Sequence, residues 1–113
     1  MEYKKQWTEF EVQSLAFGIL RKNLYPDYLV RGEYKFPGCR VDIAIFKAHK
    51  DRDPELKLVI EVKKNPAGYG VGQQIRYEAL LNVPVIYVRG GEDAYKVVEM
   101  VHPYLDVSGE GCA

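Results

Sequence analysis

The chain has 113 residues, which is enough for one compact domain and hardly for two. Hydrophobic residues make up 47% of the sequence, so we expect a folded domain rather than a disordered chain. Lysine plus arginine equals aspartate plus glutamate, at 16 each, so global charge does not attract the chain to nucleic acid. A polyanion would have to be bound by a local basic patch or through metal ions.

Residues 8–24 are predicted to form the first helix. Thr8 is a suitable N-cap, and Glu9 and Glu11 lie in the first turn, where the helix dipole favours anions. Pro26 prevents the helix from continuing. The apolar positions recur at helical spacing and predict one broad buried face: Phe10, Leu15, Phe17, Ile19, Leu20 and Leu24.

Two segments with alternating polarity follow, over 28–36 and 39–47, and Pro37-Gly38 between them is a turn signal. We predict two strands. The apolar residues expected to share a face are Val30, Tyr34 and Phe36 in the first strand, and Val41, Ile43 and Ile45 in the second. The polar residues expected on the opposite face of the first strand are Arg31, Glu33 and Lys35.

A polar segment, 48–54, closes a hairpin and leads to a third strand over 55–63. Strict alternation divides the third strand into two faces. One face carries Leu56, Leu58, Ile60 and Val62, and the other carries Lys57, Val59, Glu61 and Lys63.

The rest of the chain contains a glycine-rich loop over 65–72, a helix over about 71–82, a strand over 83–90 and a last helix over about 92–102. The tail, 105–113, is expected to be loose. The predicted order is α-β-β-β-α-β-α. This order indicates a single α/β domain over the whole chain, with a central mixed sheet flanked by helices.

Strand alternation and an antiparallel pairing of the second and third strands allow Asp42 and Glu61 to face the same side, with Lys63 one pleat further. Two carboxylates a few ångströms apart repel each other unless a cation lies between them. Hard oxygen ligands suit Mg²⁺, and a nearby lysine can stabilise a hydroxide nucleophile or the charge on a phosphate. These residue types are the ones needed for metal-assisted hydrolysis of a phosphodiester.

Simpler interpretations exist for these residues. Glu61 and Lys63 could be a solvated strand end, where such a pair contributes little energy. The apolar run Leu58-Val59-Ile60 argues against this, because it is typical of a central strand. Asp42 could cap a turn, but its place between apolar residues of a strand makes that unfavourable.

The pattern D-(18 residues)-E-V-K, on two adjacent strands after an acidic helix, resembles the PD-(D/E)xK nuclease superfamily with its restriction-endonuclease-like fold. The resemblance covers residues 8 to about 90. It implies that Asp42 and Glu61 bind Mg²⁺, for which Mn²⁺ can substitute, that the carbonyl of Val62 is a further ligand, and that Lys63 is catalytic.

An acidic residue of the first helix often completes such sites in this superfamily. Glu9 is our choice for this catalytic and metal-binding position, and Glu11 is the alternative. In a first helical turn either residue could instead be present for the helix dipole alone.

Two further features narrow the resemblance. Arg40 begins the motif R-x-D, and Gln73 and Tyr77 form Q-x-x-x-Y on one ridge of the next helix. This combination is most similar to the N-terminal nuclease domain of type I restriction motor subunits, in which the glutamine lies near the active site. We expect Gln73 and Tyr77 to contact substrate, with Lys64 and Arg40 in a local basic surface. No proline precedes Asp42 and the sequence contains no helicase motor, so a restriction role does not follow.

The sequence therefore predicts a Mg²⁺-dependent DNA endonuclease. A small domain without net charge would need a homodimer, a larger homo-oligomer or a partner protein to bind DNA tightly. A resolvase of branched DNA such as Holliday junctions, a homing endonuclease, and a catalytically silent DNA-binding module with the same fold are the alternatives.

The cysteines and histidines do not fit a zinc site in their spacing. Cys39 and Cys112 are far apart in sequence, as are His49 and His102. Free thiols in a reducing cytoplasm are the expectation. Neither a signal peptide nor a membrane span is apparent, so we expect a cytoplasmic protein that does not bind membranes.

Overall fold

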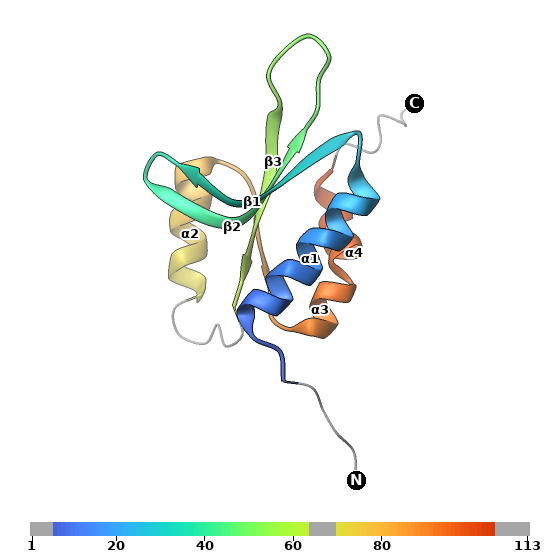
Figure 1. Cartoon of the computed structure of the whole chain (residues 1–113). Helices are drawn as coiled ribbons and strands as arrows, with labels where there is room; N and C mark the ends of the chain where they lie inside the picture. The colour runs from blue at the N-terminus through green and yellow to red at the C-terminus, as the bar shows by residue number, and fades with distance from the viewer. Residues whose placement is uncertain (1–5, 64–69, 106–113) are drawn as a thin grey trace.

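The structure, a computed structural model, describes residues 6–63 and 70–105, without the side chains of 70–75 (Figure 1). Its elements are α1 (Glu9–Leu24), β1 (Tyr28–Phe36), β2 (Cys39–Lys47), β3 (Glu55–Val62), α2 (Gly70–Leu81), β4 (Val85–Val88), α3 (Gly91–Tyr95), α4 (Val97–Val101) and the short 3-10 helix η1 (His102–Tyr104). None of the helices in these ranges has both the length and the apolar composition needed to cross a membrane.

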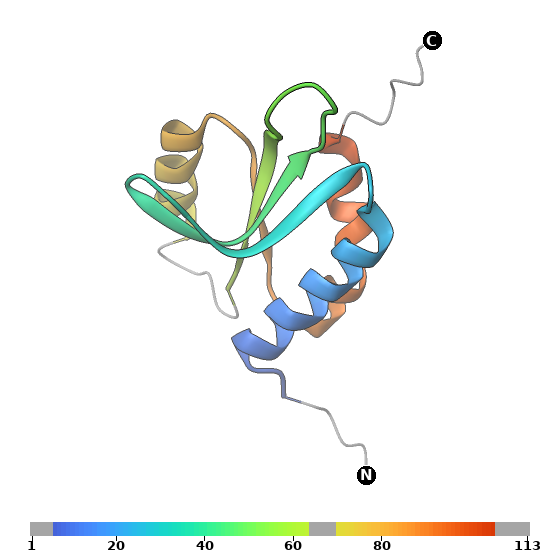
Figure 2. The same cartoon turned by 45° about the horizontal axis from the view of Figure 1, so that its top comes forward.

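The strands form one mixed sheet in the order β1-β2-β3-β4. β1 and β2 pair antiparallel, as do β2 and β3, whereas β3 and β4 are parallel. α1, α3 and α4 cover one face of the sheet and α2 covers the other (Figures 1 and 2). The described chain is therefore a mixed α/β domain with helices on both faces of a central sheet, as the sequence predicts.

α1 begins with a capping box. The N–H of Glu11 donates to Thr8 Oγ1 and the N–H of Thr8 donates to Glu11 Oε1, both at 3.0 Å. The fully buried residues of the helix recur every four positions: Val12, Ala16 and Leu20. Phe10 precedes Val12 by two residues, about 160° around the helix, and is 71% exposed. The prediction that Phe10 belongs to the buried face is therefore wrong.

The alternation of β1 side chains between the two faces of the sheet is interrupted at Glu33. Glu33 has a φ of 48°, in the left-handed region, which disturbs the alternation of the residues after it. Val30, before Glu33, is buried in the cluster under α1, whereas Phe36, after it, packs in the cluster on the α2 side. Tyr34 contacts Phe36, with 4.8 Å between ring centroids. The prediction that Val30 shares a face with Tyr34 and Phe36 is therefore wrong.

β2 departs from alternation at the same level. Val41 pairs with Tyr34 in the register and packs on the α2 side, whereas Ile43 and Ile45 pack under α1. The predicted common face of these three β2 residues is wrong, because the hairpin changes phase where Glu33 lies opposite Asp42.

β3 contains a bulge that moves one predicted core residue. Ile45 pairs with Leu58 but Phe46 pairs with Leu56, which leaves Lys57 as an extra residue in β3. Leu56 therefore packs on the α2 side rather than with Leu58 under α1, as strict alternation predicts.

The predicted helix over 92–102 is divided into two short helices. Lys96, with φ −102° and ψ 9°, lies outside the helical range and separates α3 from α4. Both pieces contact α1, and the break lets Ala94 and Val97 both reach the core, where they are fully buried.

Gly91 is expected to tolerate no side chain, because a Cβ there would overlap the indole ring of Trp7. Trp7 packs on the core and meets the ring of Tyr95 edge to face, so it cannot move aside without losing contacts. We expect Gly91→Ala to lower the free energy of unfolding by about 1–3 kcal/mol, measured by urea denaturation. The control is Gly18→Ala on the exposed side of α1, where nothing lies within 4 Å of an added Cβ. It should raise stability by about 0.5–1 kcal/mol, and equal effects of the two changes would contradict the packing argument.

Candidate active site

Asp42 and Glu61 lie where β2 and β3 stop pairing. The ladder between these strands includes Ile43 opposite Ile60, and beyond that pair the two carboxylates take the place of backbone acceptors. The N–H of Asp42 donates to Glu61 Oε2 at 3.1 Å, and the N–H of Val62 donates to Asp42 Oδ2 at 2.7 Å. Each carboxylate thus binds the opposite strand with one oxygen, and a side-chain hydrogen bond with Asp42 favours the protonated form of Glu61. We call Asp42 and Glu61 the carboxylate pair.

The carboxylate pair is buried enough to perturb its own ionisation. Glu61 is only 5% exposed, and this burial, together with the charge of Asp42, raises the pKa of Glu61 to about 7. Burial also raises the pKa of Asp42, against the hydrogen bond from Val62, which lowers it. Near neutral pH the pair therefore carries negative charge that a cation would stabilise.

Lys63 follows the last residue of β3 and is held beside β4. Its N–H donates to the carbonyl oxygen of Val88 at 3.0 Å. Its positive charge lowers the pKa of both Asp42 and Glu61, so its side chain lies within electrostatic reach of the two carboxylates. The structure thus brings together the three residues that the D…ExK pattern singles out.

The two candidate carboxylates of α1 have different surroundings. Glu11 takes part in the capping box with Thr8. The charge of Glu9 raises the pKa of Asp42, which places Glu9 on the side of α1 that looks toward the carboxylate pair. Within residues 6–63 and 70–105, no three carboxylate, histidine or cysteine side chains are close enough to hold one metal ion. Glu9 is therefore within electrostatic reach of Asp42 but does not form a three-carboxylate cluster with the carboxylate pair in this arrangement.

Gln13 and Glu33 also reach the site, although the sequence reasoning did not find them. Gln13 Nε2 lies 3.4 Å from both Glu33 Oε2 and the carbonyl oxygen of Asp42. The charge of Glu33 contributes to the raised pKa of Asp42. Two signals were present: Gln13 follows Glu9 by one helical turn, and a glycine in mid-strand, Gly32, often accompanies a bulge.

The backbone conformation of Glu33 leads to a stability prediction. A left-handed conformation costs an L-residue roughly 1–2 kcal/mol, and glycine adopts it freely. We expect Glu33→Gly to raise the free energy of unfolding by about 0.5–1 kcal/mol in urea denaturation. Lys35→Gly, at an exposed position of β1 without a positive φ, should lower it by a similar amount. A loss of stability in Glu33→Gly would mean that the contact with Gln13 outweighs the backbone strain.

Of the four residues proposed to contact substrate, the structure describes the side chains of two, Tyr77 and Arg40. The Tyr77 hydroxyl donates to the carbonyl oxygen of Arg40 at 3.4 Å, and its ring packs on the α2-side cluster, so Tyr77 joins α2 to β2. The Arg40 side chain is exposed. Gln73 lies in α2, but its side chain is outside the described part of the structure, and Lys64 lies outside the described residues.

Glu61 faces the α2 side of the sheet. Its charge contributes, after burial, to the raised pKa of the Cys39 thiol and of the Tyr87 hydroxyl, and both of these residues pack on the α2-side cluster. The positive charge of Arg76, on α2, acts on Cys39 in the opposite direction. Glu61 and Arg76, a basic residue of α2, therefore both lie within electrostatic reach of Cys39.

No protein-family model, curated protein or solved structure matches this chain.

Proposed function

We propose that this protein is a metal-dependent DNA endonuclease with a PD-(D/E)xK site on a restriction-endonuclease-like fold. The observation that carries the proposal is the carboxylate pair, fixed by reciprocal hydrogen bonds between β2 and β3, with the charge of Lys63 acting on both members. The succession of a helix, three antiparallel strands, a second helix and a parallel fourth strand supports the fold assignment.

The residues fit a hard divalent cation. Mg²⁺ in proteins is commonly held by one or two carboxylates and several waters, so Asp42 and Glu61 are sufficient, with the carbonyl of Val62 as a further ligand. The raised pKa values of the pair support the same conclusion, because burial raises both of them and a bound cation would offset the cost of burying the two negative charges. When bound, the metal would polarise a phosphoryl oxygen and make a coordinated water more acidic. Mn²⁺ has the same ligand preference and is expected to substitute.

The protein groups have separate roles in this proposal. Lys63 offers a hydrogen bond and positive charge to the phosphate oxygens, where negative charge develops in the transition state, and orients the attacking water. Glu9 accepts a hydrogen bond from water on the α1 side of the site. Gln13 is a positioning residue, because it binds the carbonyl of Asp42 and so fixes the backbone of β2 at the carboxylate pair. Gln73 positions the DNA from α2.

Cation binding is tested without cleavage by thermal denaturation at pH 8 in EDTA, Mg²⁺ or Mn²⁺. We expect either metal to raise the Tm of the wild-type protein and to leave the Tm of Asp42→Asn unchanged relative to its own EDTA value, since binding to the folded state stabilises it. Asp51→Asn, in the exposed β2–β3 loop, is the matched control and should respond like the wild type. A wild-type Tm that no divalent cation changes would contradict the metal site.

The activity is tested with supercoiled plasmid, linear duplex, single strands and a four-way junction, each in Mg²⁺, Mn²⁺ or EDTA. Metal-dependent cutting that is lost in Glu61→Gln would establish the nuclease. Cutting of the junction alone would identify a branched-DNA resolvase. Salt-sensitive DNA binding without any cutting, unchanged by Glu61→Gln, would instead indicate a silent binding module. Sizing by light scattering with and without DNA tests the proposed homodimer.

A further inference from the structure

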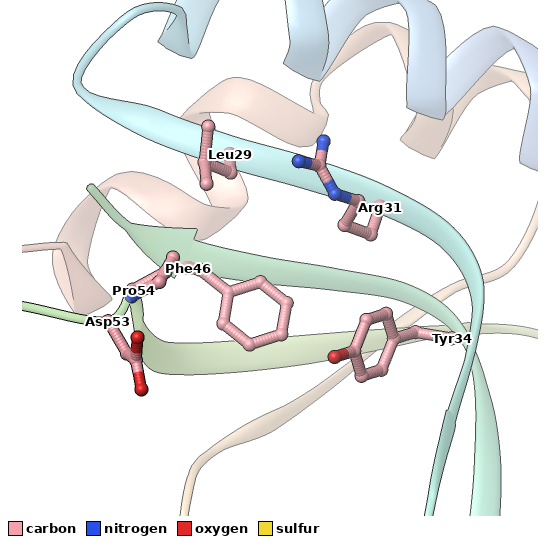
Figure 3. A pocket seen from close by; sticks show the side chains of 6 residues that line it. All are labelled: Leu29, Arg31, Tyr34, Phe46, Asp53 and Pro54. Carbon is pink, nitrogen blue, oxygen red and sulfur yellow. The ribbon is translucent and has the colours of Figure 1, made fainter.

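A pocket opens on the α2 side of the sheet (Figure 3). Its volume is about 320 Å³, and it is lined by Leu29, Arg31, Tyr34, Phe46, Asp53 and Pro54. Phe46 is four residues after Asp42 in β2, which puts the pocket about 13 Å along the strand from the carboxylate pair. The pocket is thus a separate feature on the same sheet.

The middle of the pocket is aromatic. The Tyr34 and Phe46 rings meet edge to face with 5.2 Å between their centroids, and Tyr34 is 36% exposed. Leu29 and Pro54 add apolar surface (Figure 3). Partly exposed aromatic rings beside aliphatic carbon offer a stacking surface for a flat, apolar group.

The rim of the pocket carries two opposite charges. Arg31 comes from β1 and Asp53 from the loop between β2 and β3, and their side chains lie on different sides of Phe46 (Figure 3). Neither side chain forms an ion pair with the part of the chain that the structure describes. A ligand that complements this pocket would therefore carry an anionic group and a hydrogen-bond donor, separated by a flat apolar group.

We propose that this pocket binds an unpaired nucleotide of the DNA substrate. The inference rests on the proposed function and narrows its substrate to DNA with unpaired bases near the cleavage point. The base stacks on Tyr34 and Phe46, the phosphate pairs with Arg31, and the Asp53 carboxylate accepts from an exocyclic amino group. The volume is at the lower end of the range for small-ligand sites and suits one nucleotide.

Base pairing blocks this mode in an intact duplex, because the base edges and faces are occupied by the partner strand and the stack. Bulges and single-stranded flaps present unpaired bases at no such cost. Thymine lacks an exocyclic amino group, so Asp53 should favour cytosine over thymine.

The experiment is an NMR titration of the full chain with the five-nucleotide strands dC5 and dT5, in EDTA so that no cleavage occurs. We expect shifts of backbone amides concentrated in 29–34, 46 and 53, with tighter binding of dC5. Tyr34→Ala should weaken binding roughly five- to 100-fold, and Tyr34→Phe should retain it, because stacking needs the ring alone. Asp53→Asn should remove the preference for dC5. Arg31→Gln should weaken the binding of both strands and make their affinity less dependent on salt concentration.

Tyr104→Ala is the matched control, since Tyr104 is an exposed tyrosine of η1, on the far side of the sheet from the pocket. Equal affinities of Tyr34→Ala and Tyr104→Ala, or shifts that avoid the pocket, would overturn the inference. Failure of the inference and failure of the proposed function are distinguishable. Metal-dependent cleavage without binding in the pocket leaves the nuclease standing, whereas binding in the pocket by a protein that cuts no DNA refutes the nuclease alone.

Discussion

Replacing Lys63 with alanine is expected to slow DNA cleavage by at least about 100-fold while the protein stays folded. Removing one preorganised group that stabilises transition-state charge costs about 10²–10³ in rate. Lys63 is partly exposed at the end of β3, and its backbone bond to Val88 does not depend on the side chain, so the fold should tolerate the change. The measurement is single-turnover cleavage in Mg²⁺.

The pH dependence of Lys63→Ala provides a second measurement. Lys63 lowers the pKa of both Asp42 and Glu61, so its removal should raise both pKa values and shift the residual activity to higher pH. Lys96→Ala, an exposed lysine between α3 and α4, is the control and should leave both rate and profile unchanged. Undiminished cleavage by Lys63→Ala would remove Lys63 from the proposed mechanism.

Glu61→Gln is expected to make the metal-free protein more stable at pH 8, by about 1–3 kcal/mol. The pKa of Glu61 rises from the ordinary 4.5 to about 7 on folding, so the folded state binds more protons than the unfolded state between these values. The free energy of unfolding therefore falls as pH rises through this window. The stability that protonated Glu61 provides is complete below about pH 4.5 and lost above about pH 7. Glutamine stays neutral, and its amide oxygen can still accept from the N–H of Asp42.

The measurement is urea denaturation in EDTA at pH 5 and pH 8, where the gain from Glu61→Gln should be larger at pH 8. Glu55→Gln is the control with the opposite sign, because the hydrogen bond from His49 and the charge of Lys57 lower the pKa of Glu55. It should bring no gain at pH 8. A gain from Glu61→Gln that is the same at both pH values would show that burial does not perturb Glu61 as described. A buried residue that lowers the stability of the fold is typical of a functional site.

The elements themselves could be predicted from the sequence with good accuracy. The segments 28–36 and 39–47 match β1 and β2, because alternating polarity and the Pro37-Gly38 turn mark both ends of the hairpin. Thr8 caps α1 as predicted, since its hydroxyl is well placed for the N–H of Glu11. These features depend on neighbours in sequence, which is why local patterns are sufficient to find them.

The faces of the strands were harder to predict, because they depend on backbone choices that tertiary packing makes. The left-handed Glu33 and the bulge at Lys57 each change the phase of alternation, and residues such as Tyr34 and Leu56 then lie on the side opposite to the predicted one. The break between α3 and α4 at Lys96 was equally hard to predict, because the apolar residues keep their helical spacing on both sides of Lys96. Apart from Gly32, next to Glu33, local propensity does not mark these positions clearly.

The candidate site shows the same division. Asp42, Glu61 and Lys63 stand out because charged residues within apolar strands need a reason. Gln13 and Glu33 do not stand out, because their contact joins residues 20 positions apart and depends on how α1 crosses the sheet.

The reciprocal hydrogen bonds of the carboxylate pair have a consequence for how this site can change in evolution. Asp42 and Glu61 each bind the other's strand, so losing either carboxylate removes both a proposed metal ligand and a strand-to-strand connection. An amide keeps the acceptor oxygen, whereas alanine leaves a buried N–H without a partner, which costs about 1–3 kcal/mol. Descendants that lose the proposed activity should therefore carry asparagine or glutamine at these positions more often than alanine, and they would preserve the shape of the site without its carboxylates.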